Sequence, residues 1–192
     1  MKMKKTIAFF VAMLLLCAAA LAEGGLPAYQ YTGADPLEGA VAMYTASLGE
    51  PYLHEDGDVT IPAPIIVRYI RDAESATVYG DFWVLNYVQK DNVLFCISGG
   101  ENPGVLTLKN QDGKWTVTDA EFAGDGEDYS ADIKRFCAGD EEMEKVFFEG
   151  ADLDSEAAKS IRTAYIRDYV KANGLAIDAY QDFGWDPVPL AE

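Results

Sequence analysis

Histidine and basic side chains are scarce in this chain. Its 192 residues include one histidine, His54, and 15 lysines and arginines against 32 acidic residues, so the formal net charge is −17. This acidity argues against nucleic acid and anionic membranes as partners, because both would repel the protein. A cysteine nucleophile would need a base, and His54 is the sole histidine able to serve. The composition therefore favours a soluble acidic protein over a thiol enzyme.

The N-terminal apolar run is too short to span a membrane. It covers residues 7–16, follows three lysines, and precedes a small-residue cleavage site at residues 20–22. This order is typical of a secretory signal peptide. Lipoprotein processing at Cys17 is the alternative, but Leu16 stands where that processing needs a small residue. We therefore expect residues 1–22 to be cleaved, and the mature protein to be secreted, periplasmic or held at the cell surface.

Cysteine is scarce as well. Cleavage of the signal peptide removes Cys17 and leaves Cys96 and Cys137. An even pair in an oxidising compartment predicts a disulfide bond, which would stabilise the fold by about 4 kcal/mol in the chain-entropy model. This bond would tie the third strand of the predicted sheet to the first short helix after the sheet.

The mature chain suits a single domain. Residues 23–34 combine glycine, proline and short polar residues, which is typical of a linker. Residues 35–192 have the ordinary size of a domain with its own core. This domain begins with a helix, in which Asp35 and Glu38 form a capping box and Gly49 marks the end.

Alternating apolar and polar residues follow this helix and predict β-strands. Short separators join the strands, which favours antiparallel neighbours. The chain then turns helical in three pieces, residues 130–138, 140–149 and 154–173. We therefore predict the α+β class: an N-terminal helix, a curved four-stranded antiparallel meander, and C-terminal helices packed on one face. The predicted strands are residues 59–71, 76–89, 93–98 continuing into 105–109, and 114–122.

The stretch FCISGGENPG, residues 95–104, has the glycine spacing of a phosphate-binding loop. Such a loop continues with lysine and then serine or threonine, and it opens a helix. Here Gly104 leads into a strand, and Glu101 would repel a phosphate. The stretch therefore predicts a bend that interrupts one long strand.

One face of the second predicted strand carries three aromatic residues and an acid, namely Tyr79, Asp81, Trp83 and Tyr87. If this row is uncovered, its rings offer a surface that stacks a sugar or a peptide, with Asp81 as a polar contact. In the alternative, the C-terminal tail, residues 175–192, covers the row, because this tail is too aromatic for a solvated end.

The acidic residues do not predict a metal site. Residues 119–130 approach the register of an EF-hand calcium loop, but Ala123 and Ser130 occupy two of the ligand positions. The sequence also contains no cofactor motif. We therefore expect neither a metal nor a cofactor.

The stretches YGDFWVLNY, SGGENPG and YVKANGLAIDAYQDFGWDPVP are similar to small exported bacterial proteins that carry no assigned function. The predicted order of elements resembles that of the cystatin-like and nuclear-transport-factor-2-like superfamily. This resemblance implies a pocket between the sheet and the helices. It carries over no catalytic residue, since enzymes and non-catalytic members share the shape.

These observations favour an exported, non-catalytic domain that binds a small molecule, a glycan or an extracellular protein. The alternative is a pocket enzyme of the isomerase or hydrolase type with Asp81 as general base, because ketosteroid isomerase of the same superfamily uses an aspartate base. That enzyme requires Asp81 to face a pocket with a tyrosine hydroxyl in hydrogen-bond reach. Otherwise Asp81 lies at a solvated edge or holds a backbone turn.

Overall fold

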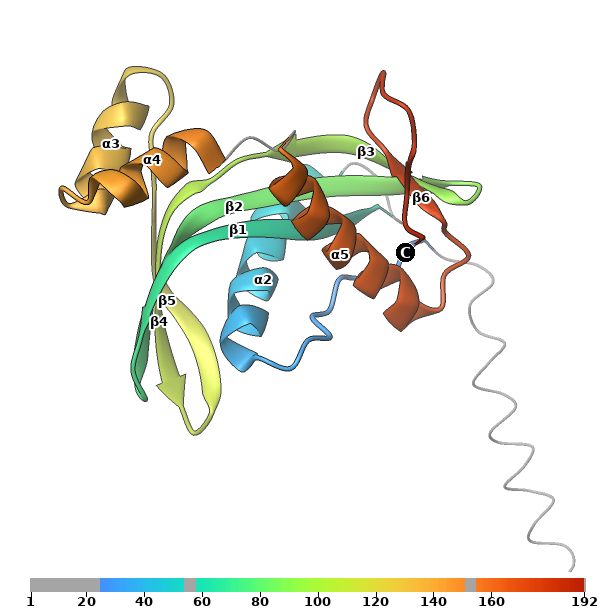
Figure 1. The fold of residues 1–192 in the computed structure, drawn as a ribbon. Coiled ribbons are helices and arrows are strands. Elements are labelled where there is room, and N and C mark those ends of the chain that lie inside the picture. Colours follow the sequence, from blue (N-terminus) through green and yellow to red (C-terminus); the bar gives the residue numbers. More distant parts are fainter. Residues whose placement is uncertain (1–24, 54–57, 151–154, 192) are drawn as a thin grey trace, which may run out of the picture.

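The computed structural model describes residues 25–53, 58–150 and 155–191 (Figure 1). The predicted signal peptide and His54 lie outside these ranges. Among the described residues, four α-helices and a seven-stranded sheet confirm the α+β class. No helix in this part of the chain is long and apolar enough to span a membrane.

The sheet is larger than predicted, and it is mixed. The first five strands pair antiparallel, whereas β6 pairs in parallel with β3. The predicted four-stranded meander does not match in detail, because the predicted third strand is two strands and the tail adds two more. The strands are β1 (Val59–Arg71), β2 (Ser75–Lys90), β3 (Val93–Gly100), β4 (Pro103–Gln111), β5 (Lys114–Phe122), β6 (Ala179–Gln181) and β7 (Val188–Pro189).

Strands β3 and β4 share one edge of the long strand β2. Residues 84–90 of β2 pair with β3 and residues 75–81 pair with β4, while β1 runs along the other edge. The predicted interruption falls at Glu101 and Asn102, where it separates two strands instead of bending one long strand. Gly104 lets β4 lie close to β5, because a Cβ at this position would collide with the main chain of β5.

Helix α2 (Pro36–Gly49) begins as its sequence predicts. The Asp35 carboxylate accepts a hydrogen bond from the Leu37 backbone N–H at 2.8 Å, so Asp35 is the N-cap. Glu38 is engaged differently from the predicted capping box, since its carboxylate accepts a hydrogen bond from the Tyr31 hydroxyl at 2.9 Å. A short 3-10 turn, η1 (Glu50–Tyr52), follows the helix.

Three further helices follow the sheet: α3 (Glu127–Cys137), α4 (Glu141–Gly150) and α5 (Glu156–Asn173). The predicted cap of α5, Asp154, lies outside the described residues. Ser155 caps this helix, and its hydroxyl accepts a hydrogen bond from the Ala158 backbone N–H at 3.2 Å. The predicted end of α5 is confirmed, because Gly174 takes the left-handed conformation with φ of 61°.

The helices cover the two faces of the sheet differently. Helix α2 lies in the hollow of the curved sheet, where Val41 and Phe82 belong to one buried cluster (Figure 1). Successive side chains of a strand point to opposite faces, so Tyr79 and Tyr87 lie on the other face. There Tyr87 shares a buried cluster with Ile166 of α5, and Tyr79 packs against the cluster formed by α3 and α4.

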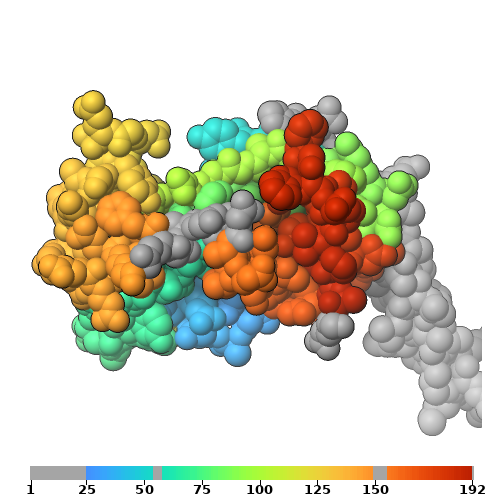
Figure 2. Space-filling view, turned by 45° about the horizontal axis from the view of Figure 1, so that its top comes forward, coloured from blue at the N-terminus to red at the C-terminus, as the bar shows by residue number. Residues whose placement is uncertain are grey.

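The C-terminal tail packs on the domain only in part. Tyr180 of β6 is 1 % exposed and lies in the cluster beneath α5. Phe183 and Trp185, at the turn between β6 and β7, are 97 % and 68 % exposed. This turn stands out from the surface (Figure 2). The predicted docking of the tail therefore holds for Tyr180, but not for Phe183 and Trp185.

The predicted linker packs on the domain where it is described. Residues 25–34 contain no helix or strand. Tyr29 is nevertheless buried between side chains of α5, at a ring-centroid distance of 6.5 Å from both Tyr165 and Tyr169. This contact places the segment beside α5.

Candidate functional site

The aromatic row predicted on β2 is covered in part. Tyr87 is fully buried, and its hydroxyl accepts a hydrogen bond from Arg162 Nε of α5 at 2.8 Å. Trp83 is half-buried beside the same cluster, and Tyr79 is half-buried beside the cluster of α3 and α4. Helices α3, α4 and α5 and Tyr180 of the tail pack over this face, so Tyr87 is inaccessible and Tyr79 and Trp83 are partly covered.

Asp81 lies inside the protein and holds the bend. It is 1 % exposed, and its Oδ1 accepts a hydrogen bond from the Asn102 backbone N–H at 3.0 Å. Among the described residues, Asp81 Oδ2 and Trp83 Nε1 are buried without a hydrogen-bond partner. The tyrosine hydroxyl that the enzyme alternative requires is therefore not within reach of Oδ2 in this part of the chain.

The electrostatic environment of Asp81 favours its neutral form. Burial, followed by the charge of Glu101, raises the pKa of the Asp81 carboxyl to about 7. The backbone N–H of Asn102 and the indole N–H of Trp83 act in the opposite direction. The Trp83 N–H is near enough to influence the carboxyl, although it lacks hydrogen-bond geometry. Burial prevails because the carboxylate would hold its charge with one oxygen unpaired.

The predicted disulfide between Cys96 and Cys137 is wrong, because both are free cysteines. Cys96 in β3 packs beside the cluster beneath α5, and its thiol donates to the Ser98 carbonyl at 3.4 Å. Cys137, at the end of α3, is part of the separate cluster of α3 and α4. Spacing and compartment could not reveal that the two thiols belong to different clusters.

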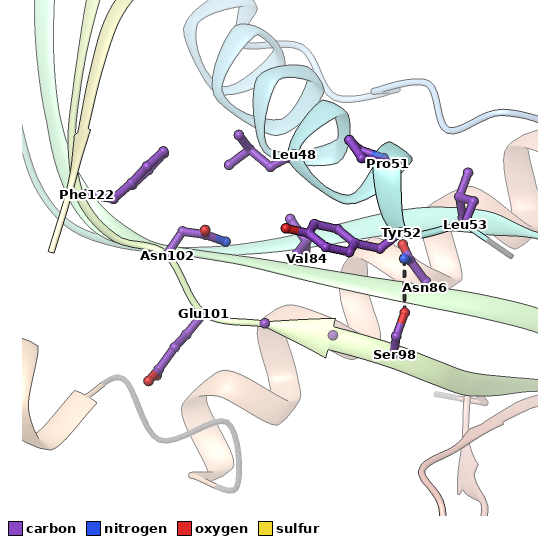
Figure 3. Close-up of a pocket in the computed structure, with 12 residues that line it drawn as sticks. Leu48, Pro51, Tyr52, Leu53, Val84, Asn86, Ser98, Glu101, Asn102 and Phe122 are labelled. Atoms are coloured by element: carbon purple, nitrogen blue, oxygen red, sulfur yellow. Dashed lines mark hydrogen bonds between the residues drawn. The ribbon is translucent and has the colours of Figure 1, made fainter. Parts of the chain in front are cut away.

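A cavity of about 650 Å³ opens on the opposite face of β2 from the aromatic row, beside the bend (Figure 3). The end of α2 and η1 form one side, and the strands with the bend form the other. Its volume falls within the range of small-molecule sites. The side chains that shape it are Leu48, Pro51, Tyr52, Leu53, Val84, Asn86, Ser98, Glu101, Asn102 and Phe122.

Asn86 forms hydrogen bonds with residues on both sides of this cavity. It is 2 % exposed, and its Oδ1 accepts a hydrogen bond from the Thr60 hydroxyl at 2.6 Å. Its Nδ2 donates to the Gly49 carbonyl at 3.2 Å and to Ser98 Oγ at 3.1 Å (Figure 3). Gly49 lets α2 approach this closely, because a Cβ there would stand 2.5 Å from the Thr60 side chain. One amide therefore joins α2, β1 and β3.

The groups that remain free to bind a ligand are uncharged. Ser98 Oγ accepts the hydrogen bond from Asn86, so its hydroxyl proton is available. Asn102 Nδ2 donates to a β2 carbonyl at 3.0 Å, which leaves its Oδ1 as an acceptor. Glu101 lines the rim, but its side chain points away from the other labelled side chains in Figure 3. The cavity thus presents the hydroxyls of Ser98 and Tyr52 and the amide oxygen of Asn102 against largely apolar walls, with Glu101 at the rim.

Sequence reasoning found one side of this cavity and missed the other. The glycines of the bend single out residues 98–102, but they predict a structural role only and give no sign of a cavity. Tyr52 was missed, because it reaches the bend only through the tertiary packing of α2 and η1. Asn86 carried an available signal, since it is a polar residue on a strand face otherwise occupied by Val84 and Phe82.

The chain matches no family model, and no curated protein or solved structure is significantly similar to it. Within the described ranges, no group of three or more His, Cys, Asp or Glu side chains is placed to hold a metal ion. In the acidic stretch compared with a calcium loop, Glu121 instead binds Arg135 at 2.6 Å.

Proposed function

We propose that this chain is an exported, non-catalytic domain whose cavity binds a small neutral ligand of the sugar class. The observation that carries the proposal is the cavity of about 650 Å³ with largely apolar walls and uncharged inward-facing polar groups, whose single acidic lining residue, Glu101, points away from the other labelled side chains. A sugar matches both kinds of lining. Its C–H groups pack on an aromatic ring, and its hydroxyls form hydrogen bonds with amides and hydroxyls. Tyr52, Ser98 and Asn102 are the side chains that would make these contacts.

The charge of the protein supports a neutral ligand. The formal net charge of −17 disfavours phosphorylated, sulfated or uronic-acid ligands, because their charge has the same sign. No lysine or arginine side chain lines the cavity within the described ranges, so an anion would find no partner there. Export would place the domain where free and polymeric sugars are its neighbours.

The placement of the cavity is consistent with the superfamily resemblance. We propose membership of the cystatin-like and nuclear-transport-factor-2-like superfamily from the leading helix that lies in the hollow of a curved sheet. The cavity between η1 and β2 supports this proposal, because the resemblance implies a pocket between the sheet and the helices. This assignment adds a shape to the proposal and no residue role.

Binding is tested with the protein that begins at residue 23, screened against immobilised neutral and anionic glycans. Gly100→Leu is the informative variant, because a Cβ at Gly100 meets no atom within 4 Å. Gly100 pairs with Val84, so its side chain would enter the cavity from the strand face. We expect this variant to lose at least about tenfold in affinity for the neutral glycan that binds best.

Thr116→Leu is the matched control, since Thr116 is exposed on β5 and does not line the cavity. It adds the same side chain at a distant strand position and should leave binding unchanged. Equal affinity of both variants, or a preference for anionic glycans, would remove the support for this site.

The second candidate is the pocket enzyme with Asp81 as general base. The raised pKa of about 7 suits proton transfer near neutral pH, but Asp81 Oδ2 has no tyrosine hydroxyl in hydrogen-bond reach among the described residues, so this candidate ranks below the binding domain. Turnover of isomerase or hydrolase substrates that disappears in Asp81→Asn, with the fold retained, would favour this candidate over the binding domain.

A further inference from the structure

A second cavity, of about 150 Å³, lies between residues 29–33, the first turn of α2 and helix α5. Four tyrosine rings and two carboxylates surround it. This site is separate from the cavity beside the bend and shares no residue with it. The residues that carry the argument are Tyr29, Tyr31, Tyr165, Tyr169, Glu38 and Asp168.

Four tyrosine rings line the cavity, and we call this set the aromatic cage. The ring centroid of Tyr29 lies 6.5 Å from those of Tyr165 and Tyr169, with interplanar angles of 32° and 24°. Two of the four tyrosine hydroxyls donate hydrogen bonds within the protein. Tyr169 donates to the Pro27 carbonyl at 2.7 Å, and Tyr31 donates to Glu38 at 2.9 Å.

Two glycines leave the space that the Tyr31 ring occupies. A Cβ at Gly33 would collide with the Tyr31 hydroxyl, and a Cβ at Gly39 would stand 2.8 Å from the Tyr31 ring. The ring thus occupies space that any other residue at these positions would fill. Together with the bond to Glu38, this packing sets the orientation of Tyr31 before any ligand arrives.

Two acidic residues, Glu38 and Asp168, line the cavity. Burial and then Glu38 raise the pKa of the Tyr31 hydroxyl to about 12. Burial, together with Asp168 among other neighbours, also raises the pKa of Tyr29 and Tyr165. No lysine or arginine lines this cavity within the described ranges. The tyrosines remain neutral, and the two carboxylates favour a positive guest.

We propose that this cavity binds a quaternary ammonium group, such as the trimethylammonium of a choline-type molecule. A cation placed within about 6 Å of aromatic ring centres is attracted to their faces, most strongly where it loses little hydration. The tyrosine rings favour a methylated ammonium, because recognition of quaternary ammonium groups is the characteristic use of such ring faces. Glu38 and Asp168 supply the countercharge.

Isothermal titration with tetramethylammonium and with choline tests the proposal. The neutral isostere 3,3-dimethyl-1-butanol has the shape of choline without its charge and is the matched ligand control. We expect choline to bind and the isostere to bind at least about tenfold more weakly. Equal binding of the two, or no saturation by either ammonium ion up to about 50 mM, would overturn the proposal.

Two variants assign the binding to this cavity. Tyr31→Leu removes a cage ring, and Asp168→Asn removes an exposed carboxylate without a large change of shape. We expect about tenfold weaker choline binding in the first and a several-fold loss in the second. If Tyr31→Leu does not fold, Asp168→Asn still tests the proposal, because its substitution lies at an exposed position. Unchanged affinity in Asp168→Asn, in low salt, would contradict the electrostatic part of the argument.

The source of the ammonium group is distinguished with vesicles of phosphatidylcholine. Co-sedimentation that free choline displaces supports the site and assigns a lipid headgroup. Binding of free choline without co-sedimentation supports the site and assigns a soluble or polymer-borne ammonium. Sedimentation that is unchanged in Tyr31→Leu and Asp168→Asn would contradict recognition by this cage.

Discussion

Replacing Asp81 by asparagine should stabilise the protein above neutral pH. The Asp81 carboxyl is 1 % exposed, and one of its oxygens has no hydrogen-bond partner among the described residues. Asparagine keeps an oxygen that accepts the Asn102 backbone N–H and removes the buried charge. The variant thus imitates the protonated state of Asp81 at every pH.

The magnitude follows from the raised pKa. The Asp81 carboxyl titrates near 3.8 in the unfolded chain and at about 7 in the folded protein. The folded state therefore holds the proton more tightly, so stability from this group is full below the unfolded value and is lost as the pH rises through 7. Three pKa units correspond to about 4 kcal/mol, of which about 3 kcal/mol falls between pH 5 and pH 8.

Urea unfolding at pH 5 and pH 8 measures this effect. We expect the free energy of unfolding of Asp81→Asn, relative to that of the wild type, to be about 3 kcal/mol higher at pH 8 than at pH 5. Asp125→Asn is the matched control, since Asp125 is exposed, and its stability should follow the wild type. Parallel curves for the wild type and Asp81→Asn would refute the account of a buried, incompletely paired carboxyl.

Three further outcomes are expected. Asn86→Ala should destabilise by about 3 kcal/mol in urea unfolding, because two buried hydrogen bonds and one part-buried hydrogen bond disappear; a loss below about 1 kcal/mol would contradict the role of this amide. Arg162→Met should expose the tail to limited proteolysis, because it breaks the paired bonds to Asp182 at 2.7 and 2.6 Å; an unchanged cleavage rate would argue against this anchor. In unreduced, denatured protein from residue 23, Cys96 and Cys137 should both react with a thiol reagent. In native protein Cys96 should react slowly, since burial raises its pKa to about 11.

Local signals in the sequence predicted the elements that depend on neighbouring residues. Asp35 and Gly174 mark helix ends through side-chain capping and left-handed backbone geometry, which act within a few residues. The bend at residues 99–104 was predictable because glycines interrupt a strand pattern. These features need no knowledge of the rest of the fold.

Features that depend on distant packing could not be read in this way. The parallel pairing of β6 with β3 brings residue 179 beside residue 93, and no turn signal connects them. The disulfide was predicted from compartment and count, whereas its formation depends on which clusters the two cysteines join. The same limit applies to the cavity, since η1 meets the bend only through the packing of α2.

The central claim is that the cavity beside the bend binds a neutral sugar. Its most direct test is an amide chemical-shift titration of ¹⁵N-labelled protein from residue 23 with the neutral glycan that binds best. The account predicts the largest shift changes at Tyr52 and at residues 98–102, and their disappearance in Gly100→Leu. Shift changes that cluster elsewhere and persist in Gly100→Leu would contradict it.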